Sequence, residues 1–354
     1  MAVVVLKEIL GDIARWRRDG ERIAVATVVA TRRSAPRPVG AKLGVSAGGE
    51  LAGSVSGGCV ENEVYGAAQE VLAGAPPSLL TFGISDDLAL EVGLPCGGEI
   101  DVFVVEPDGE LLERLKTIVE DERRAVLFTV VDGDEIGRTW LAVEGEATST
   151  PPALAAEVGE LLRSGRSRVL EHAGTTVFAD VYEPPPRLLV IGAVDTAEAL
   201  CAAAGQLGWR TFVADARGKF ATAERIPSAD EVIVGWPEEA LERVRPDSAT
   251  AVLVLTHDDR FDVPALKGAL ETDAFYVGAL GSRRNQERRR GRLLEAGVPE
   301  ESLDRISGPC GLDIGAVTPA ETAVSILAEM LARRANRAGG PLQTASGRIH
   351  AGVD

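Results

Sequence analysis

The sequence predicts an α/β protein with two domains: an N-terminal α+β domain that carries glycine-rich cysteine loops, and a Rossmann-like domain built on a parallel sheet. Three observations support this fold class. The chain has 354 residues, which is more than one ordinary hydrophobic core accommodates. Apolar residues make up 45% of the chain and aromatic residues only 4%, which is typical of a fold built on Val, Leu and Ala. Beyond residue 187, continuous apolar strands alternate with segments of helical length, as in a parallel sheet covered on both faces.

The N-terminal domain is predicted to span residues 1–183, with 108–183 assigned to it as well. Apolar residues at helical spacing indicate its helices, and apolar runs between turn residues indicate its strands. The predicted elements are helices over 5–18, 61–73, 111–119 and 153–163, strands over 23–33, 78–84, 98–107, 125–131 and 138–143 with two more before 183, and a glycine-turned hairpin over 41–57.

The segment EPPPR, 183–187, is the clearest linker, because three prolines forbid a helix and stiffen the connection. The Rossmann-like domain is predicted over 184–337, and the remaining residues, 338–354, are predicted to form a disordered tail. Its predicted strands are RLLVIGA, RTFVADA, EVIVG, TAVLVLTH and AFYVGAL.

A final helix begins at TPAE. Thr318 caps it, Pro319 takes the first helical position, and Glu321 closes a capping box. The helical spacing of its apolar residues predicts an inward face that Ile326 widens and that is formed by Ala323, Val324, Leu327, Met330 and Leu331.

Composition and charge exclude several classes of protein. A net charge of −17 argues against a nucleic-acid partner, because binding to a phosphate backbone needs clustered Lys and Arg. No apolar run has the roughly 20 residues of a membrane helix, and the opening MAVVVLKEIL lacks the pattern of a secretory signal. The four cysteines lie far apart without C-x-x-C spacing, which argues against zinc and disulfides. We therefore expect a cytoplasmic protein with free thiols, without a membrane partner.

The first turn of the Rossmann-like domain, VIGAVDTA, departs from the dinucleotide-binding pattern G-x-G-x-x-G/A. Gly192 and Ala197 take the first and third glycine positions, but Val194 replaces the second. A β-branched side chain there obstructs the approach of a pyrophosphate, and the neighbouring Asp195 repels it. Asp215 stands at the distance expected of a ribose-binding acid. The sequence thus predicts a Rossmann-like fold in which NAD(P) binding in the usual pose is disfavoured. The alternative to a ligand-binding loop is one that only makes a tight turn between strand and helix.

Several long motifs, in order along nearly the whole chain, resemble the XdhC/CoxI family of accessory factors for xanthine dehydrogenase and related molybdenum hydroxylases. They include GSVSGGCVENEV, GLPCGGEIDVFVVEP, THDDRFD, GALGSRRNQERR and GLDIGAVTPAETAVSILAE. The resemblance implies a protein that binds molybdenum cofactor (molybdopterin or its cytosine dinucleotide), protects it while the metal is sulfurated, and delivers it into the large subunit of an apo molybdenum hydroxylase. It also implies a homodimer, and a cysteine desulfurase as a further partner.

The resemblance implies a pocket formed by the two cysteine loops. Cys59 and Cys96 are its thiols, and Asp313 comes from the last motif. The glycine-rich segments beside the thiols would line it: Ser56, Gly57 and Gly58 in the first loop, and Gly97 and Gly98 in the second.

The sequence departs from the family at three points. Arg33 stands where T-x-G-S-x-P-R has glycine, GAVD replaces G-A-G-H, and Cys310 occupies the middle of the turn before LDIGA.

The loop around Cys59 suits a thiol that meets a ligand. Glycines let backbone N–H groups converge on a ligand and leave the sulfur uncovered. The position just before a predicted helix favours thiolate, a soft ligand suited to molybdenum or to carrying sulfur. The alternative is a tight hairpin with an inert thiol. For Cys96 the same two interpretations, a thiol that meets a ligand and an inert thiol, stay open. Cys201 is predicted to lie in the core, and Cys310 is either structural or part of the same cleft.

The strongest anion candidate is GSRRNQERRRGR, 281–292, which has six arginines in an acidic chain. Arg283 and Arg284 are the favoured pair, because they follow a strand at the edge where open α/β sheets bind ligands. The arginines from 288 to 292 either bind an anion or form a solvated helix face paired with acids.

The pair Arg37 and Lys42, in SAPRPVGAK, is predicted as a second anion contact. His257, in THDD, either acts as an acid/base or orienting group or caps the following turn.

The residues leave open whether the chain is an enzyme. A cofactor chaperone is the favoured hypothesis, and an NAD(P)-dependent oxidoreductase acting on a small molecule is the runner-up. A third is a degenerate scaffold that only docks a molybdenum hydroxylase.

Overall fold

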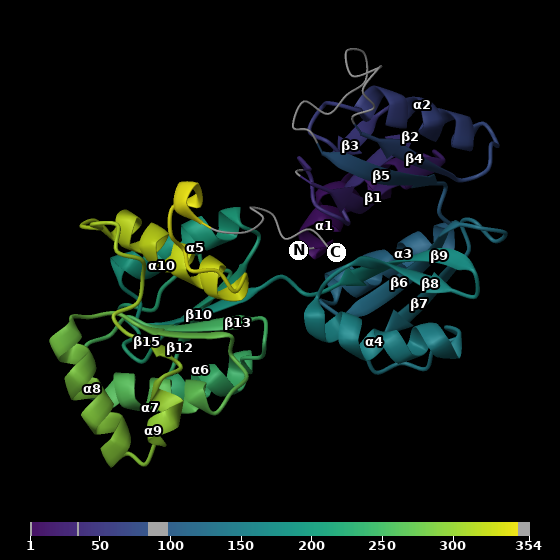
Figure 1. The fold of residues 1–354 in the computed structure, drawn as a ribbon. Coiled ribbons are helices and arrows are strands. Elements are labelled where there is room, and N and C mark those ends of the chain that lie inside the picture. The colour runs from purple at the N-terminus through teal and green to yellow at the C-terminus, as the bar shows by residue number, and fades with distance from the viewer. Residues whose placement is uncertain (1, 34, 84–97, 346–354) are drawn as a thin grey trace. The chain divides into compact units, whose positions relative to one another are not determined.

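The computed structural model describes residues 2–33, 35–83 and 98–345, with side chains from Ile9 onward (Figure 1). The chain divides into two compact units at Pro184–Pro185, inside the proline-rich segment. Parallel and antiparallel sheets are both present, which confirms the predicted α/β class. Within the predicted tail, Leu342–Thr344 form a short 3-10 helix, and 346–354 lie outside the described residues.

The first unit contains an antiparallel sheet whose described strands run in the order β3-β2-β1-β5-β4. Helix α2 packs on this sheet through Val64, Ala68 and Val71, which repeat at helical spacing and share a core with strand residues. The bounds are β1 (Ile23–Arg32), β2 (Lys42–Ser46), β3 (Leu51–Gly53), α2 (Glu61–Leu72), β4 (Ser78–Phe82) and β5 (Glu99–Val105).

A second antiparallel sheet in the same unit has the order β7-β6-β9-β8. Two helices, α1 and α3, bury apolar residues in a core that includes strands of both sheets, and α4 covers a separate core with β6 and β9. The bounds are α1 (Ala2–Arg18), α3 (Gly109–Glu120), β6 (Ala125–Asp132), β7 (Thr139–Val143), α4 (Pro152–Ser164), β8 (Arg168–His172) and β9 (Thr175–Tyr182).

A buried ion pair ties the two sheets together. Lys42 Nζ lies 2.6 Å from Asp180 Oδ2, and both side chains are at most 5% exposed. The Tyr182 hydroxyl donates to the same carboxylate at 2.8 Å and Ser167 Oγ donates at 3.1 Å. A buried charge is tolerated only when paired and hydrogen-bonded, as this one is. Lys42 is therefore a structural cation, and its predicted role as an anion contact is wrong.

The second unit is a parallel sheet in the order β12-β11-β10-β13-β14-β15. Numbered along the chain from β10, this is the 3-2-1-4-5-6 order of a Rossmann fold. The strands are β10 (Arg187–Ile191), β11 (Arg210–Asp215), β12 (Glu231–Val234), β13 (Thr250–Val254), β14 (Tyr276–Ala279) and β15 (Ile306–Ser307).

Helices cover both faces of this sheet (Figure 1). One face packs against α5 and α10, and the other against α6, α7 and α8. The helices are α5 (Asp195–Gln206), α6 (Pro237–Val244), α7 (Asp259–Leu270), α8 (Arg283–Glu295), the short α9 (Glu300–Leu303) and α10 (Pro319–Arg334).

Helix α10 begins with the predicted capping box, in which Thr318 Oγ1 accepts from the Glu321 N–H. Its predicted inward face is wrong in part: the side of the helix with Val324 and Leu331 is exposed, at 56% and 40%. The buried stripe is narrower and follows Ala323, Ile326–Leu327 and Met330, the i, i+3, i+4, i+7 spacing of one helix face. None of the described helices has both the length and the apolar run needed to cross a membrane.

Candidate functional site

The cysteine loop connects β3 to α2 and displays Cys59 at its exposed end. Val55 and Val60 anchor both sides of the loop in the core of the first sheet, and both are fully buried. Gly57 and Gly58 between them have φ angles of +77° and +111°, a region that glycine occupies without strain. The loop therefore projects a thiol from a rigid base.

The N–H groups of this loop are used within the loop. Glu61, the first residue of α2, accepts from the Ser56 and Gly58 N–H groups at 2.9 and 2.8 Å, and from the hydroxyls of Ser54 and Ser56. Ser54 Oγ accepts from the Gly57 N–H at 2.8 Å. Ser56 Oγ accepts from the N–H groups that follow, those of Cys59 and Val60, both at 2.9 Å. The expectation that backbone N–H groups of 56–60 converge on a ligand is therefore wrong, and what the loop offers is the thiol.

Glu61 is held ionised by these donors. Burial raises the pKa of its carboxyl, but the hydrogen bonds from Ser54, Ser56 and Gly58 outweigh burial and lower the pKa to about 2. This residue was not among those predicted from the sequence. The signal was present, since a Glu follows the loop within the first turn of the helix.

The other candidates of the first unit are less informative. Cys96 and Gly97 lie outside the described residues, and Gly98 is buried just before β5. Arg37 is half-buried and engaged in contacts. Arg33, where the family has glycine, is exposed with a φ of +61°, so the backbone keeps the left-handed conformation that glycine favours.

In the second unit, the N–H groups of the altered Rossmann turn are hydrogen-bonded to other groups of the same unit. The Gly192 N–H donates to Ala214 O, the Ala193 N–H to Asp215 Oδ2 at 3.0 Å, and the Val194 N–H to Gly192 O. A Cβ at Gly192 would lie 2.9 Å from the Thr256 methyl group, so the turn also lies tightly against the loop that follows β13. The first turn of α5 then carries acids and no bases. These features do not fit a pyrophosphate.

Asp215, at the end of β11, has its acceptor capacity filled. Its Oδ1 accepts from the N–H and Nε of Arg217, both at 2.9 Å. Its Oδ2 accepts from Ala193 and from Arg217 Nη2 at 2.7 Å. Burial raises the pKa of this carboxyl, but these donors together lower it. A ribose hydroxyl would have to displace one of these bonds, which disfavours NAD at this position.

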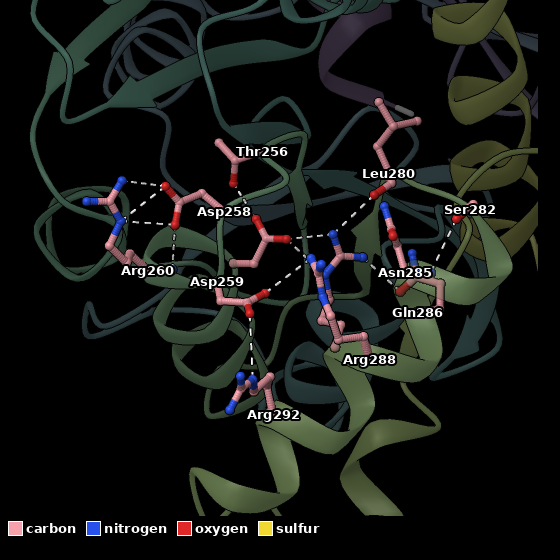
Figure 2. Close-up of polar contacts among 12 residues, drawn as sticks. Thr256, Asp258, Asp259, Arg260, Leu280, Ser282, Asn285, Gln286, Arg288 and Arg292 are labelled. Carbon is pink, nitrogen blue, oxygen red and sulfur yellow. Dashed lines mark hydrogen bonds and ion pairs between the residues drawn. The ribbon is translucent and has the colours of Figure 1, made fainter.

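The THDD and arginine-rich motifs are joined by a buried network. Asp262 of α7 accepts from Thr256 Oγ1 and from Arg289 Nε and Nη2, at 3.0 and 2.6 Å for the two nitrogens. Arg289 also donates to Leu280 O and Gln286 Oε1, so its guanidinium spans α7, α8 and the end of β14. The dashed lines in Figure 2 follow this network. At 3% exposure Arg289 is a structural residue.

The remaining arginines of the segment fall into two groups. Arg288, Arg290 and Arg292 lie near Asp259, Glu300 and Glu295. Arg283 and Arg284, in the first turn of α8, are exposed, and their side chains form no ion pair or hydrogen bond with any residue in the described ranges. Ser282 caps this turn by accepting from the Asn285 N–H at 3.2 Å (Figure 2). Two guanidinium groups with no acidic partner in the described part of the chain thus lie where α8 begins, just after β14.

The last motif also reaches this end of the sheet. The Cys310 N–H donates to Ala279 O, and burial raises the pKa of the Cys310 thiol to about 12, so it is a neutral, packed group. Asp313 is exposed. Cys201 is buried in α5, as predicted.

His257 is exposed and makes no hydrogen bond or ion pair with another described residue, so no group within those ranges orients it for proton transfer.

Five predicted residues therefore lie at or just beyond the carboxyl ends of the parallel strands, where such sheets bind ligands. Gly192 follows β10, Asp215 ends β11, His257 follows β13, and the Arg283–Arg284 pair follows β14. Sequence reasoning missed Arg217, although its partner Asp215 lies only two residues away. It also did not separate Arg289, whose partner Asp262 is 27 residues away, from the other arginines of its segment.

The fold and these side chains define a two-unit α/β protein with a Rossmann domain and an exposed thiol loop. Family comparisons agree: the family described as the XdhC and CoxI family matches residues 16–83, and the one described as the XdhC Rossmann domain matches 188–330. The chain belongs to the XdhC/CoxI family.

Named relatives are similar over most of the chain. A protein from Bacillus subtilis, named as a probable subunit of xanthine dehydrogenase, is 28% identical over 89% of this chain and 94% of its own length. The molybdenum cofactor insertion chaperone PaoD from Escherichia coli is 26% identical over 89% of this chain and 85% of its own. A crystal structure titled as a xanthine dehydrogenase from Bacillus halodurans has a TM-score of 0.73 and 26% identity, and covers 95% of this chain and 97% of that one.

Proposed function

We propose that this chain is a molybdenum-cofactor chaperone that binds the sulfurated cofactor and delivers it to the large subunit of a molybdenum hydroxylase. The observation that carries the proposal is the exposed Cys59 thiol on a loop whose N–H groups are already used. Such a loop offers a soft sulfur ligand, which suits molybdenum. The name of the PaoD relative supports the same role.

The cargo is an anion with a phosphate and a metal, and each unit, taken by itself, has a side chain that suits one of these parts. Arg283 and Arg284 would bind the phosphate, since guanidinium groups recognise phosphate by paired hydrogen bonds. Cys59, on the first unit, is proposed independently of that pair as a contact for the metal or its sulfur. The backbone of the GAVD turn, by contrast, supplies no free N–H from 192 to 194.

The test is the amount of pterin retained by the purified chain after expression beside molybdopterin biosynthesis, measured as oxidised-pterin fluorescence after denaturation. We expect Cys59→Ala to lower retention about tenfold, the effect of losing one contact to a charged group. The thiol makes no contact on which the loop depends, so the fold should be unchanged. Retention equal to the wild type would remove Cys59 from the site.

The arginine pair is tested with a matched control. Arg283→Ala with Arg284→Ala should lower retention by at least about tenfold. Arg290→Ala removes the same kind of charge from the same helix, but its guanidinium is paired with Glu300 at 3.0 Å, so retention should stay as in the wild type. Equal losses in both variants would mean that overall charge, and not this pair, binds the cargo.

Delivery is tested separately. The loaded chain, mixed with an apo molybdenum hydroxylase, should lose pterin as the hydroxylase gains activity, and a cysteine desulfurase with cysteine should increase that activity if sulfur is added while the cofactor is held. Light scattering after gel filtration should give the mass of a homodimer. Transfer of pterin without gain of activity would contradict delivery of a sulfurated cofactor.

A further inference from the structure

Five donors of the cysteine loop converge on one carboxylate. Glu61 accepts from the Ser54 hydroxyl, from the Val55, Ser56 and Gly58 N–H groups, and from the Ser56 hydroxyl. They come from both sides of the loop, before and after its turn. The carboxylate therefore fixes the shape of the whole loop and not only one contact in it.

Ser56 relays this anchoring to Cys59. Its hydroxyl donates to Glu61 Oε2 and accepts from the Cys59 and Val60 N–H groups. Ser56 is 1% exposed, so the relay lies below the surface while the thiol lies above it. One hydroxyl thus separates the carboxylate from the backbone of the cysteine.

The loop needs such an anchor. A Cβ on Gly57 or Gly58 would meet no atom within 4 Å, so no packing restrains this part of the chain. Glycine loses more conformational freedom on folding than other residues, and two in succession would leave the thiol mobile unless hydrogen bonds hold them. Hydrogen bonds to a charged acceptor are the strongest available here.

We propose that Glu61 is the positioning residue for Cys59: its carboxylate holds the 54–60 loop in the one conformation that presents the thiol. The claim that Cys59 then meets a ligand rests on the proposed function, whereas the anchoring of the loop does not.

Three variants separate charge from geometry. Glu61→Gln keeps the shape of the side chain but replaces one acceptor oxygen by a donor, and Glu61→Asp keeps the charge but withdraws it by one methylene. Glu63→Gln is the matched control, because Glu63 is exposed in the same first turn of α2 and is absent from the loop contacts. Unfolding midpoints of all variants establish that each is folded.

Amide hydrogen exchange of the 54–60 segment measures the anchoring alone. We expect exchange to become about tenfold faster in Glu61→Gln, to increase less in Glu61→Asp, and to stay at the wild-type rate in Glu63→Gln, because a bond to a charged acceptor is worth about a factor of ten. Equal rates in Glu61→Gln and Glu63→Gln would overturn the proposal.

Pterin retention in a double variant tests whether Glu61 acts through Cys59. If it does, Cys59→Ala with Glu61→Gln should retain as much as Cys59→Ala alone, whereas a general structural role would make the losses additive. An additive loss overturns the proposal. If the wild-type chain retains no pterin, the proposed function fails, and if Cys59→Ala retains pterin normally, Cys59 is not part of the site. In both cases exchange alone decides for or against Glu61.

Discussion

The cysteine loop and the first Rossmann turn are both glycine-containing connections, but only the cysteine loop exposes a reactive group. Each connects a strand to a helix, and in each a carboxylate takes backbone N–H groups of the loop: Glu61 in the first, Asp215 in the second. In the first, the carboxylate comes from the helix that follows and the loop ends in an exposed thiol. In the second it comes from the neighbouring strand and is covered by Arg217, which leaves nothing presented.

The difference shows what a glycine-rich sequence does and does not specify. Glycine permits a backbone conformation, such as the φ of +113° at Gly192 or +111° at Gly58. It does not determine whether the N–H groups of that backbone face a ligand or a side chain of the same protein. The direction of the N–H groups depends on where the nearest carboxylate lies, and in both loops a carboxylate of the same unit lies within hydrogen-bonding distance.

The largest effect on stability should come from removing the Asp215 carboxylate, which accepts a hydrogen bond from the Rossmann turn. Asp215→Ala leaves the buried Ala193 N–H without a partner and releases Arg217, so we expect the second unit to lose about 3 kcal/mol of unfolding free energy. Urea titration followed by hydrogen exchange in β10 and β11 measures this. Asp195→Ala, at an acid 86% exposed, should change it by no more than about 0.5 kcal/mol. Similar losses in both variants would show that Asp215 does not brace the turn.

Much of the fold was predictable because its signals are local. The strands of the second unit are continuous apolar runs and the α10 capping box is a four-residue pattern, so both appear at the predicted places. Lys42 was not predictable in the same way: it looks like a free cation in the sequence, and its partner Asp180 lies 138 residues away.

The candidate site shows the same limit. The segment 281–292 could be identified as basic, but only the packing of α7 against α8 divides it into a buried Arg289, a set paired with acids and the exposed Arg283–Arg284 pair. Partners of this kind are set by the fold, and the sequence around an arginine does not reveal them. Glu61 is different, because it lies close to the loop in sequence and could have been found.

Lowering the pH should have a smaller effect on the hydrogen bonds that hold the two loops. The pKa of Glu61 in the folded chain is about 2, below its ordinary value of 4.5. The stability that its carboxylate contributes is therefore fully present above pH 4.5 and is lost as the pH falls through 2. The amide signals of Ser56 and Gly58 should therefore show no midpoint between pH 5 and 3 in an NMR titration. Asp215 also has a lowered pKa, so any midpoint for the Ala193 amide should lie below the ordinary value of an aspartate. A midpoint near 4.5 for the Ser56 and Gly58 amides would mean that Glu61 does not hold them in solution.

The smallest effect should come from restoring the glycine pattern itself. Val194→Gly recreates G-x-G in the first turn and removes the β-branched side chain that obstructs a pyrophosphate. We nevertheless expect no NADH binding in a fluorescence titration, because Asp215 still accepts four hydrogen bonds and Asp195 and Glu198 still place negative charge in the first turn of α5. Adding Arg217→Ala, which frees acceptor positions on Asp215, is the stronger challenge. If Val194→Gly alone bound NADH, one side chain would be the whole obstacle and the occupied acceptors would not matter. If binding appeared only in the double variant, the carboxylate's internal partners would be what distinguishes this turn from a dinucleotide site.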